Sequence, residues 1–285
     1  MLRIDPKEIS TPQLHGYLLG AVAPRPICFA STVDAEGNVN LAPYSFFNVF
    51  SANPPIMIFS PARRVRGNTT KHTLENIWET KEVVINIVSH AMVQQMSLSS
   101  TEYAKGVNEF IKAGFTELPS EKVAPPRVAE APVQFECKVN DVIALGNEGG
   151  AGNLVIAEVV QLHVDESILD TDGRIDPRKI DTVSRLGGNW YSRAKEGLFE
   201  VEKPLRTLGI GVDALPEHIR GSKVLTGNDL GKLANVEALP SEEQVLKLAK
   251  TIAGMSSEEI HQKAMKCLAN GKNEEALGLL MTQTL

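Results

Sequence analysis

The sequence predicts a mainly β barrel domain followed by a helical extension. Short runs rich in apolar and β-branched residues recur through the first two hundred residues, with turn residues between them. The regular alternation of strands and helices that builds a doubly wound sheet is not present in the pattern. From Ser241 onward the pattern is helical. We therefore expect a β domain over residues 1–203 and a mostly helical extension over residues 204–285.

The composition is typical of a soluble cytoplasmic protein. Of the 285 residues, 42% are hydrophobic, which is enough for a sizeable core, and the net charge is −6. With no long basic block, a nucleic-acid or anionic-membrane partner is not favoured. The N-terminus has no apolar leader, and no run of about 18 apolar residues occurs. The three cysteines are widely spaced and form no CxxC pair, as expected in a reducing compartment.

The first half of the chain predicts short strands and helices in close succession. Thr11 is expected as the N-cap of the first helix, with Pro12 at its first helical position. Strands are predicted where β-branched residues cluster, and helices where apolar residues recur at helical spacing. The expected elements are a helix over Thr11–Leu19, strands over Ile27–Val33, Val39–Leu41 and Ile56–Phe59, a helix over His72–Thr80, a strand over Glu82–Val88, a helix over His90–Ser100 and a partly helical connection over Ser99–Phe115.

The second half predicts a long hairpin and then helices. Phe135–Leu145 and Asn153–Val164 are expected to pair across a glycine-rich turn, whose glycines lack the GxGxxG order of a phosphate-binding loop. Ser241 and Ser256 each open a helix with a capping-box pattern, and a third helix is expected over Asn273–Met281.

The stretch Asn40–Asn48 is unusual for a strand. Three of the four residues in Tyr44–Phe47 are aromatic, so rings would project from both faces of an extended backbone. Pro43 has no N–H and is expected to interrupt ladder pairing. Ala42 has almost no side chain, so a flat ligand could approach the main chain there. From the pattern alone, a bulged core strand is favoured over a ligand-binding wall.

A second feature, Arg63–Thr73, predicts an anion site. It gathers three arginines, Lys71 and three threonines at a helix start, where free backbone N–H groups and the helix dipole favour a phosphate. The alternative is a solvated basic loop in which Thr70 only caps the helix. A third feature, Ser184–Tyr191, joins an arginine, a Gly-Gly bend and two aromatic residues, and it predicts either a ligand-closing segment or a structural turn.

Motifs for protein-based catalysis are missing. The six histidines show no HxH or HExxH spacing, so a metal site is not expected, and no GxSxG sequence occurs. Cys28 lies within an apolar strand and is interpreted as inert core rather than as a nucleophile. An aromatic strand beside a phosphate site, without an acid–base pair, indicates that a cofactor carries the chemistry.

Five motifs in a fixed order resemble the flavin reductase-like, FMN-binding split-barrel family, which includes flavoredoxin-type members. The resemblance covers roughly residues 15–200. The motifs are Pro24–Thr32, Asn40–Phe47, Pro54-Pro55, Lys71-His72-Thr73 with Asn76, and Glu82–Asn86.

The resemblance implies a split β-barrel that forms a homodimer with FMN near the subunit interface. It implies that Ser31, Thr32 and the backbone from Ala42 to Phe47 line the flavin ring and ribityl chain. Residues toward the phosphate would include Ser60, Lys71 and Thr73, with help from the arginines. The full set of expected cofactor-binding residues is Ser31, Thr32, Ala42, Pro43, Tyr44, Ser45, Phe46, Phe47, Ser60, Arg66, Lys71, His72, Thr73, Asn86, Arg185 and Tyr191.

The chain departs from the family at His72, because the family commonly has Lys-Asp-Thr at this motif. The exchange removes a negative charge beside the expected phosphate, and a histidine could donate a hydrogen bond to it.

The implied function is an NAD(P)H-dependent flavin reductase, in which NADH or NADPH passes a hydride to bound FMN while backbone N–H groups stabilise the reduced flavin. The alternatives are a non-enzymatic FMN electron carrier for a protein partner, and an interaction protein with a vestigial site. Free flavin, a partner monooxygenase, ferric iron and a small organic molecule all stay open as electron acceptors. The helical extension is expected to pack on the barrel or on a second subunit, which is favoured over a role as a substrate lid.

Overall fold

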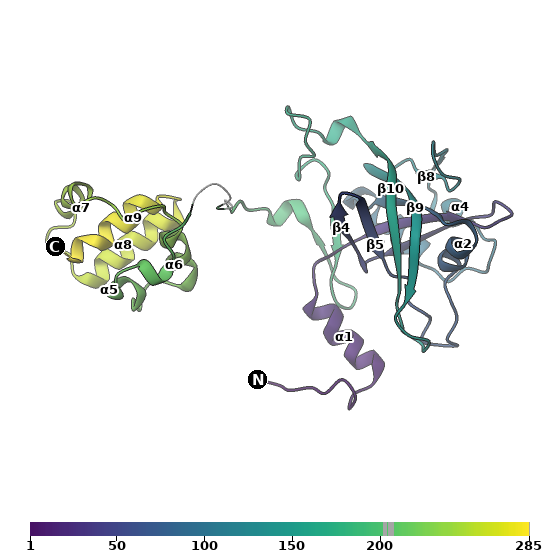
Figure 1. The fold of residues 1–285 in the computed structure, drawn as a ribbon, viewed down its shortest axis with the longest axis horizontal. Helices are drawn as coiled ribbons and strands as arrows, with labels where there is room; N and C mark the ends of the chain where they lie inside the picture. The colour runs from purple at the N-terminus through teal and green to yellow at the C-terminus, as the bar shows by residue number, and fades with distance from the viewer. Residues whose placement is uncertain (202–203, 205–207, 285) are drawn as a thin grey trace. The chain divides into compact units, whose positions relative to one another are not determined.

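The chain forms two compact units, each described here by itself. The computed structural model describes residues 1–201, 204 and 208–284. The first unit spans Met1–Leu198 and the second Phe199–Leu285 (Figure 1). The domain boundary expected at residue 203 falls outside the described residues.

A seven-stranded antiparallel sheet dominates the first unit, in the spatial order β3-β2-β6-β9-β10-β5-β4. This agrees with the predicted mainly β domain, and each expected strand is present. The strands are β2 (Cys28–Val33), β3 (Val39–Tyr44), β4 (Phe47–Ala52), β5 (Pro55–Phe59), β6 (Glu82–Ile87), β9 (Val133–Ala144) and β10 (Asn153–Val164).

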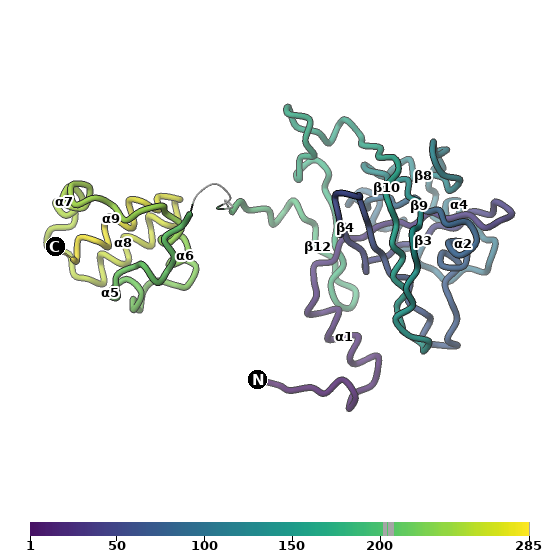
Figure 2. The backbone as a smooth tube through the Cα atoms, in the orientation of Figure 1, coloured from purple at the N-terminus to yellow at the C-terminus, as the bar shows by residue number. Residues whose placement is uncertain are grey.

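The predicted hairpin is confirmed as the longest strand pair of the sheet. Strands β9 and β10 run antiparallel over their whole lengths, and their register shifts at two irregular points (Figure 2). Such bulges increase the local twist, which bends a long pair around a core. The glycine-rich segment between them is a turn, as expected.

The two faces of the sheet bury different residues of β2 because side chains alternate along a strand. Phe29 faces a cluster that includes Leu41, Met96 and Phe110. Cys28 and Ala30 face the opposite cluster, with Phe59, Ile77 and Val155 among its members. Burial also raises the pKa of the Cys28 thiol, which keeps it protonated. The interpretation of Cys28 as inert core is therefore supported.

Strand β3 forms one edge of the sheet and runs straight through Pro43, so the prediction that Pro43 interrupts the pairing is wrong. Cys28 to Val33 pair with Tyr44 to Val39 without a shift. The N–H of Leu41 points away from β2 and donates to Glu109 Oε2 at 2.9 Å. Because antiparallel residues alternate in direction, Pro43 also faces outward, where a missing N–H costs no ladder bond.

Four helices accompany the sheet in the first unit. The predicted helix at His72–Thr80 is confirmed as α2. The first helix begins with Ser10 as N-cap, one residue before the predicted cap, because Gln13 Oε1 accepts hydrogen bonds from both the N–H and the hydroxyl of Ser10. The segment predicted as one helix over His90–Ser100 starts as a 3₁₀ turn, His90–Met92. The other helices are α1 (Thr11–Ala21), α3 (Val93–Ser99) and α4 (Glu109–Ala113).

Two small sheets complete this unit. One contains β1 (Arg25–Pro26), β11 (Val183–Arg185) and β12 (Tyr191–Arg193), and the other pairs β7 (Glu117–Leu118) with β8 (Arg127–Val128). Arg25 is buried and donates to the carbonyl oxygens of Leu19, Val22 and Leu186 at 2.7, 2.7 and 3.0 Å. It therefore ties the end of α1 to the β11–β12 hairpin.

The second unit is helical, as expected. Ser241 and Ser256 cap their helices through the predicted capping boxes, and the last helix matches the predicted Asn273–Met281. Its core includes Leu233, Leu268 and Leu280. The helices are α5 (Glu217–Arg220), α6 (Gly227–Ala234), α7 (Glu242–Ala249), α8 (Ser257–Ala269) and α9 (Asn273–Met281). Across the residues that the structure describes, no helix is both long and apolar enough to cross a membrane.

Candidate functional site

Two adjoining cavities lie at the β3 edge of the large sheet. They share Pro43, Tyr44 and Ser100 in their walls, so they adjoin at these residues. The smaller has a volume of about 100 Å³ and lies toward α2, and the larger has about 480 Å³ and lies toward the β11–β12 hairpin. Together they bring the aromatic stretch, the helix start and the Arg185–Tyr191 segment into one place.

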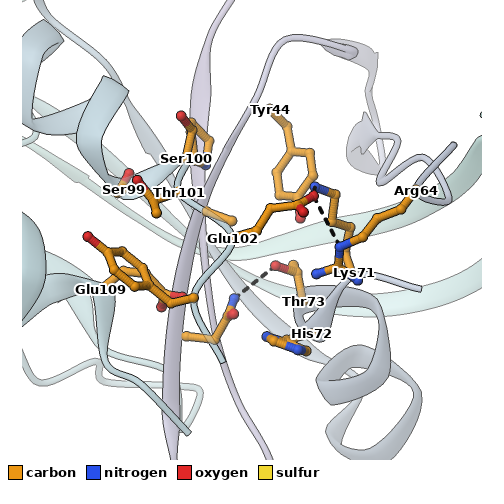
Figure 3. A pocket seen from close by; sticks show the side chains of 14 residues that line it. Tyr44, Arg64, Lys71, His72, Thr73, Ser99, Ser100, Thr101, Glu102 and Glu109 are labelled. Atoms are coloured by element: carbon orange, nitrogen blue, oxygen red, sulfur yellow. Dashed lines mark hydrogen bonds and ion pairs between the residues drawn. The ribbon is translucent and has the colours of Figure 1, made fainter. Parts of the chain in front are cut away.

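The smaller cavity has a cationic wall made by Arg64 and Lys71 (Figure 3). Both cations contact the same oxygen of Glu102. The Arg64 Nε–Glu102 Oε1 distance is 3.2 Å, and the Lys71 Nζ–Glu102 Oε1 distance is 3.6 Å. One carboxylate oxygen therefore forms ion pairs with both cations of this wall.

The turn between β9 and β10 fixes the direction of Arg64. The N–H of Arg63 donates to Ala151 O at 2.8 Å, and the Gly150 N–H donates to Arg63 O at 3.0 Å. A side chain at Gly149 would meet Val65 O at 2.8 Å, so this close approach needs glycine. The glycine-rich turn thus positions the arginine segment.

Helix α2 presents its N-terminus to the same cavity. Lys71 is the N-cap, and no side chain caps the helix. Thr70, the expected cap in the solvated-loop interpretation, instead donates to Glu75 Oε1 at 2.5 Å. The first N–H groups of α2, those of His72 and Thr73, are therefore available to an external acceptor at the positive end of the helix dipole.

Thr73 is held by a buried polar chain. Asn40 Nδ2 donates to Thr73 Oγ1 at 2.8 Å, and Asn76 Nδ2 donates to Thr32 Oγ1 at 3.1 Å. All four side chains are buried. Thr73 Oγ1 thus accepts from Asn40 and also lies close to the Tyr44 hydroxyl, whose pKa burial raises and this contact partly lowers.

The larger cavity is lined by Ser45, Arg185 and Tyr191, three of the residues predicted to bind the cofactor. The guanidinium of Arg185 lies over the Tyr191 ring, 4.5 Å from its centroid. Register pairing places these two residues opposite each other across the β11–β12 hairpin. The predicted Arg185–Tyr191 segment therefore forms one wall of a cavity.

Three titratable side chains of the smaller cavity, Tyr44, His72 and Glu109, have shifted pKa values. Burial raises the pKa of Tyr44, whose hydroxyl makes no hydrogen bond of standard geometry with the described residues. Burial lowers the pKa of His72, with nearby cations acting in the same direction, so the imidazole is neutral at pH 7. Burial raises the pKa of Glu109, against the hydrogen bond from Leu41.

Several residues expected at the cofactor do not line either cavity. Asn86 is fully buried and accepts from the Val128 N–H at 3.0 Å, while Ser60 Oγ accepts from the Asn153 N–H at 3.1 Å. Ser31 and Thr32 are also fully buried, within β2. These four positions support the sheet around the cavities.

Some of the remaining expected residues line the cavities, and others lie on the protein surface or against the core. Phe46 is exposed and packs its ring edge against His15, and Phe47 packs against the core. Arg66 is exposed, and it is Arg64 that lines the cavity. The expected residues found at the cavities are Ala42, Pro43, Tyr44, Ser45, Lys71, His72, Thr73, Arg185 and Tyr191.

Sequence reasoning missed the segment after α3. Ser99–Tyr103 and Glu109 line the smaller cavity, although the sequence predicted only an irregular or partly helical connection there and no site residue. A run of hydroxyl residues before Glu102 was the only local signal. Among residues 1–201, 204 and 208–284, no group of three or more histidine, cysteine or acidic side chains could hold a metal ion.

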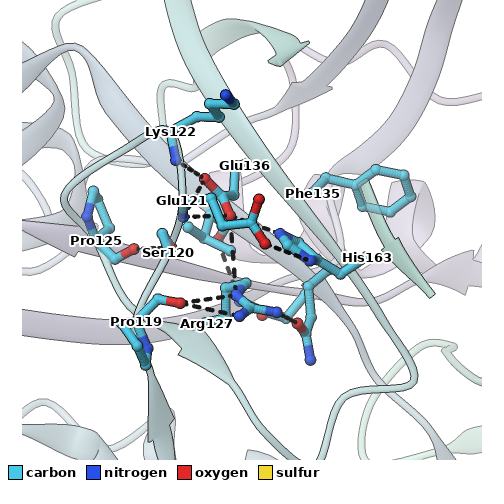
Figure 4. A network of polar contacts seen from close by, with 12 residues as sticks. Pro119, Ser120, Glu121, Lys122, Pro125, Arg127, Phe135, Glu136 and His163 are labelled. Carbon is cyan, nitrogen blue, oxygen red and sulfur yellow. Dashed lines mark hydrogen bonds and ion pairs between the residues drawn. The ribbon is translucent and has the colours of Figure 1, made fainter. Parts of the chain in front are cut away.

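A second polar cluster, centred on Glu136, lies away from the cavities (Figure 4). Its carboxylate is fully buried and accepts from the Glu121 N–H at 2.9 Å, the Lys122 N–H at 2.6 Å and His163 Nε2 at 2.7 Å. Burial alone would raise the pKa of Glu136, but these hydrogen bonds outweigh it and hold the pKa below its usual range. The carboxylate is fully occupied in fastening a loop.

Comparison with known proteins identifies a common domain. Residues 20–179 match the family described as flavin reductase like domain. An uncharacterised protein of Halalkalibacterium halodurans is 38% identical over 205 residues, which are 71% of this chain and 97% of that protein. The match to this relative thus leaves more than a quarter of this chain uncovered.

Solved structures show the same architecture. Component B of nitrilotriacetate monooxygenase from Bacillus cereus is 33% identical, with a TM-score of 0.65 over 71% of this chain and 98% of that one. A split-barrel-domain protein from Shewanella frigidimarina, assigned as a flavin reductase, is 27% identical, with a TM-score of 0.61 over 71% and 100% of the two chains. The expected split barrel with C-terminal helices is confirmed. With a family match over more than half of its length, this chain belongs to the flavin reductase-like family, whose members support a flavin-related oxidoreductase function.

Proposed function

We propose that this chain is an FMN-binding oxidoreductase, and specifically an NAD(P)H-dependent flavin reductase. One observation carries the proposal. A cavity with a cationic wall and a helix N-terminus adjoins a larger cavity lined by tyrosines, and the two share Pro43 and Tyr44. One end suits a phosphate and the other a flat ring. Membership in the flavin reductase-like family supports a flavin as the ligand with this shape.

The residues at the smaller cavity fit the phosphate end of FMN. Lys71, Arg64 and the uncapped N-terminus of α2 supply the positive charge and N–H donors that a phosphate needs. Thr73 adds a buried hydroxyl at the start of the helix. His72 is neutral near pH 7, so it would donate to the phosphate as an uncharged imidazole.

The residues at the larger cavity fit a ring system. Its volume of about 480 Å³ lies in the usual range of roughly 300–1,000 Å³ for small-molecule sites. Pro43 and Tyr44 line this cavity as well as the smaller one, and the buried Tyr44 hydroxyl is a polar group that lacks a partner of standard geometry among the described residues. A ligand acceptor would satisfy that hydroxyl, because its raised pKa keeps it protonated.

A bound flavin supplies the hydride-accepting chemistry that the lining side chains lack. The chain's own contribution is to hold the ligand, to keep Tyr44 protonated as a donor, and to leave the face toward Arg185 and Tyr191 for a nicotinamide. The outer edge of β3 offers carbonyl groups, since Leu41 donates to Glu109 and Pro43 has no N–H. Main-chain donors toward a ring would therefore come from Ser45 onward.

Anaerobic reduction of the purified protein tests the proposal. The preparation, or the protein after incubation with FMN, is expected to absorb near 450 nm, and NADH or NADPH is expected to bleach this band. Flavin that is bound but not bleached by either nicotinamide would replace the reductase with an electron carrier for a protein partner. Absence of flavin binding would remove both functions.

We propose that the electron acceptor is a partner monooxygenase or free flavin. Similarity to component B of a monooxygenase supports the partner monooxygenase. We also propose that the protein forms a homodimer and acts in the cytoplasm. Apolar side chains are exposed on the sheet, including those of Val49, Phe50 and Leu162, and they support the homodimer because a partner subunit would cover them. Equilibrium sedimentation tests the dimer, and a strictly monomeric wild-type protein would contradict it.

A further inference from the structure

Glu102 places a carboxylate oxygen between the two cations that would hold a phosphate (Figure 3). Its Oε1 lies 3.2 Å from Arg64 Nε and 3.6 Å from Lys71 Nζ. Another nitrogen of the Arg64 guanidinium is held by the protein, because Nη1 donates to the carbonyl oxygen of Thr70 and, at 3.2 Å, to Thr69 Oγ1. Glu102 therefore lies against one of the donor groups through which Arg64 could contact an anionic ligand.

The ion pairs of Glu102 are of a kind that an anionic ligand could replace. The glutamate follows α3 in an irregular segment, and its side chain is 63% exposed, whereas the Arg64 side chain is 19% exposed. Ion pairs with a solvated partner contribute little, and water stabilises a released carboxylate. Arg64 is fixed by the neighbouring turn, so the movable partner of the pair is the acid.

A phosphate and Glu102 would compete for this wall. A phosphate monoester carries about −1.5 to −2 charges near pH 7 and would lie next to a carboxylate of the same sign. The repulsion between the two anions, and their attraction to the same two cations, set them in competition at Arg64 and Lys71.

We propose that Glu102 is a specificity-determining residue: an internal anion that competes with the flavin phosphate for Arg64 and Lys71. The inference rests on the proposed FMN site. Its consequence is that the competition acts only on flavins that carry a phosphate, so it weakens FMN binding without changing riboflavin binding. A weakened phosphate hold makes the bound flavin exchangeable, which suits delivery of flavin to another protein.

Titration of wild type and Glu102→Gln with FMN and with riboflavin, followed by flavin fluorescence, tests the inference. The variant keeps the size of the side chain and removes its charge. We expect FMN to bind about 2–10-fold more tightly to the variant, the range of one or two exposed ion pairs, and riboflavin to bind equally to both proteins. Glu36→Gln, in the exposed turn between β2 and β3, is the control for net charge and is expected to change neither affinity.

A second protein variant separates the competition between Glu102 and the phosphate from other effects of the glutamine. In Lys71→Ala protein, the gain from Glu102→Gln is expected to shrink, since one of the two contested cations is gone. An unchanged FMN affinity in Glu102→Gln would overturn the inference while leaving the FMN site intact. Equal tightening for FMN and riboflavin would also overturn it. Wild-type protein that binds neither flavin would instead remove the proposed function itself.

Discussion

Two glutamates, Glu102 and Glu136, each face an arginine in the first unit, yet their surroundings are opposite. Glu136 is fully buried and accepts from two backbone N–H groups and a histidine. Glu102 is mostly exposed, and it forms ion pairs with Arg64 and Lys71. A buried carboxylate with every lone pair used is committed to the fold, whereas an exposed one with movable contacts is available for exchange.

Removing the buried carboxylate is expected to have the largest effect. Glu136→Ala leaves the N–H groups of Glu121 and Lys122 without their acceptor and should lower the free energy of unfolding by about 3–5 kcal/mol. Denaturant unfolding measures the change. A loss below about 1 kcal/mol would show that water replaces the carboxylate, and the contrast with Glu102 would then fail.

The Glu136 carboxylate also predicts that the free energy of unfolding decreases at acid pH. Because the pKa of Glu136 is lower in the folded protein than its ordinary value of 4.5, its contribution is present above that value. It is lost as the pH falls through the folded pKa. Wild-type protein should therefore lose stability more steeply than Glu136→Gln below pH 4.5, and parallel curves would contradict the prediction.

Removing a cation from the cavity is expected to affect binding more than stability. Lys71→Ala should weaken FMN about tenfold or more, as for the loss of one charge-assisted contact, and should leave riboflavin nearly unchanged. The matched control is Arg66→Ala, since Arg66 is exposed and lines neither cavity. Equal losses in both variants would indicate general attraction rather than a defined phosphate contact.

Glu109 sharpens the comparison because it is buried like Glu136 but has fewer donors. Burial raises its pKa, so the folded protein holds this proton at a pH where the unfolded chain has released it. Its effect on stability is most favourable below pH 4.5 and declines as the pH rises through the folded pKa. Glu109→Gln should be free of this decline, and an unchanged slope in pH-dependent melting would contradict the assignment.

The exposed glutamate should matter least to the fold. Glu102→Ala is expected to change the free energy of unfolding by less than about 0.5 kcal/mol, as is usual for a surface ion pair. Thermal melting alongside Glu136→Ala measures the difference directly. A loss comparable to that of Glu136 would mean that Glu102 fastens its segment and is not free to leave.

The sequence predicted best where local chemistry sets the structure. The helix at His72–Thr80 and the caps at Ser241 and Ser256 follow from spacing and hydrogen-bonding residues that lie within one turn of each other. The hairpin of β9 and β10 follows from two long apolar runs around glycines. Elements of this kind depend little on the rest of the chain.

The cavity was predicted less completely because its walls come from distant segments. Nothing local distinguishes Arg64 from Arg66, and the choice is made by backbone bonds between Arg63 and the turn at Gly150–Ala151. Glu109 reaches the cavity only because it accepts from Leu41, 68 residues earlier. Contacts of this range leave no periodicity in the sequence.

The outer edge of β3 has a consequence for how the protein behaves in a crowded solution. An open sheet edge with free N–H groups recruits strands from other chains and can lead to aggregation. Here Pro43 offers no donor, and the donor of Leu41 is already bound by Glu109. Strand addition is therefore blocked along the edge that borders the cavities, which leaves their entrance open to a small molecule.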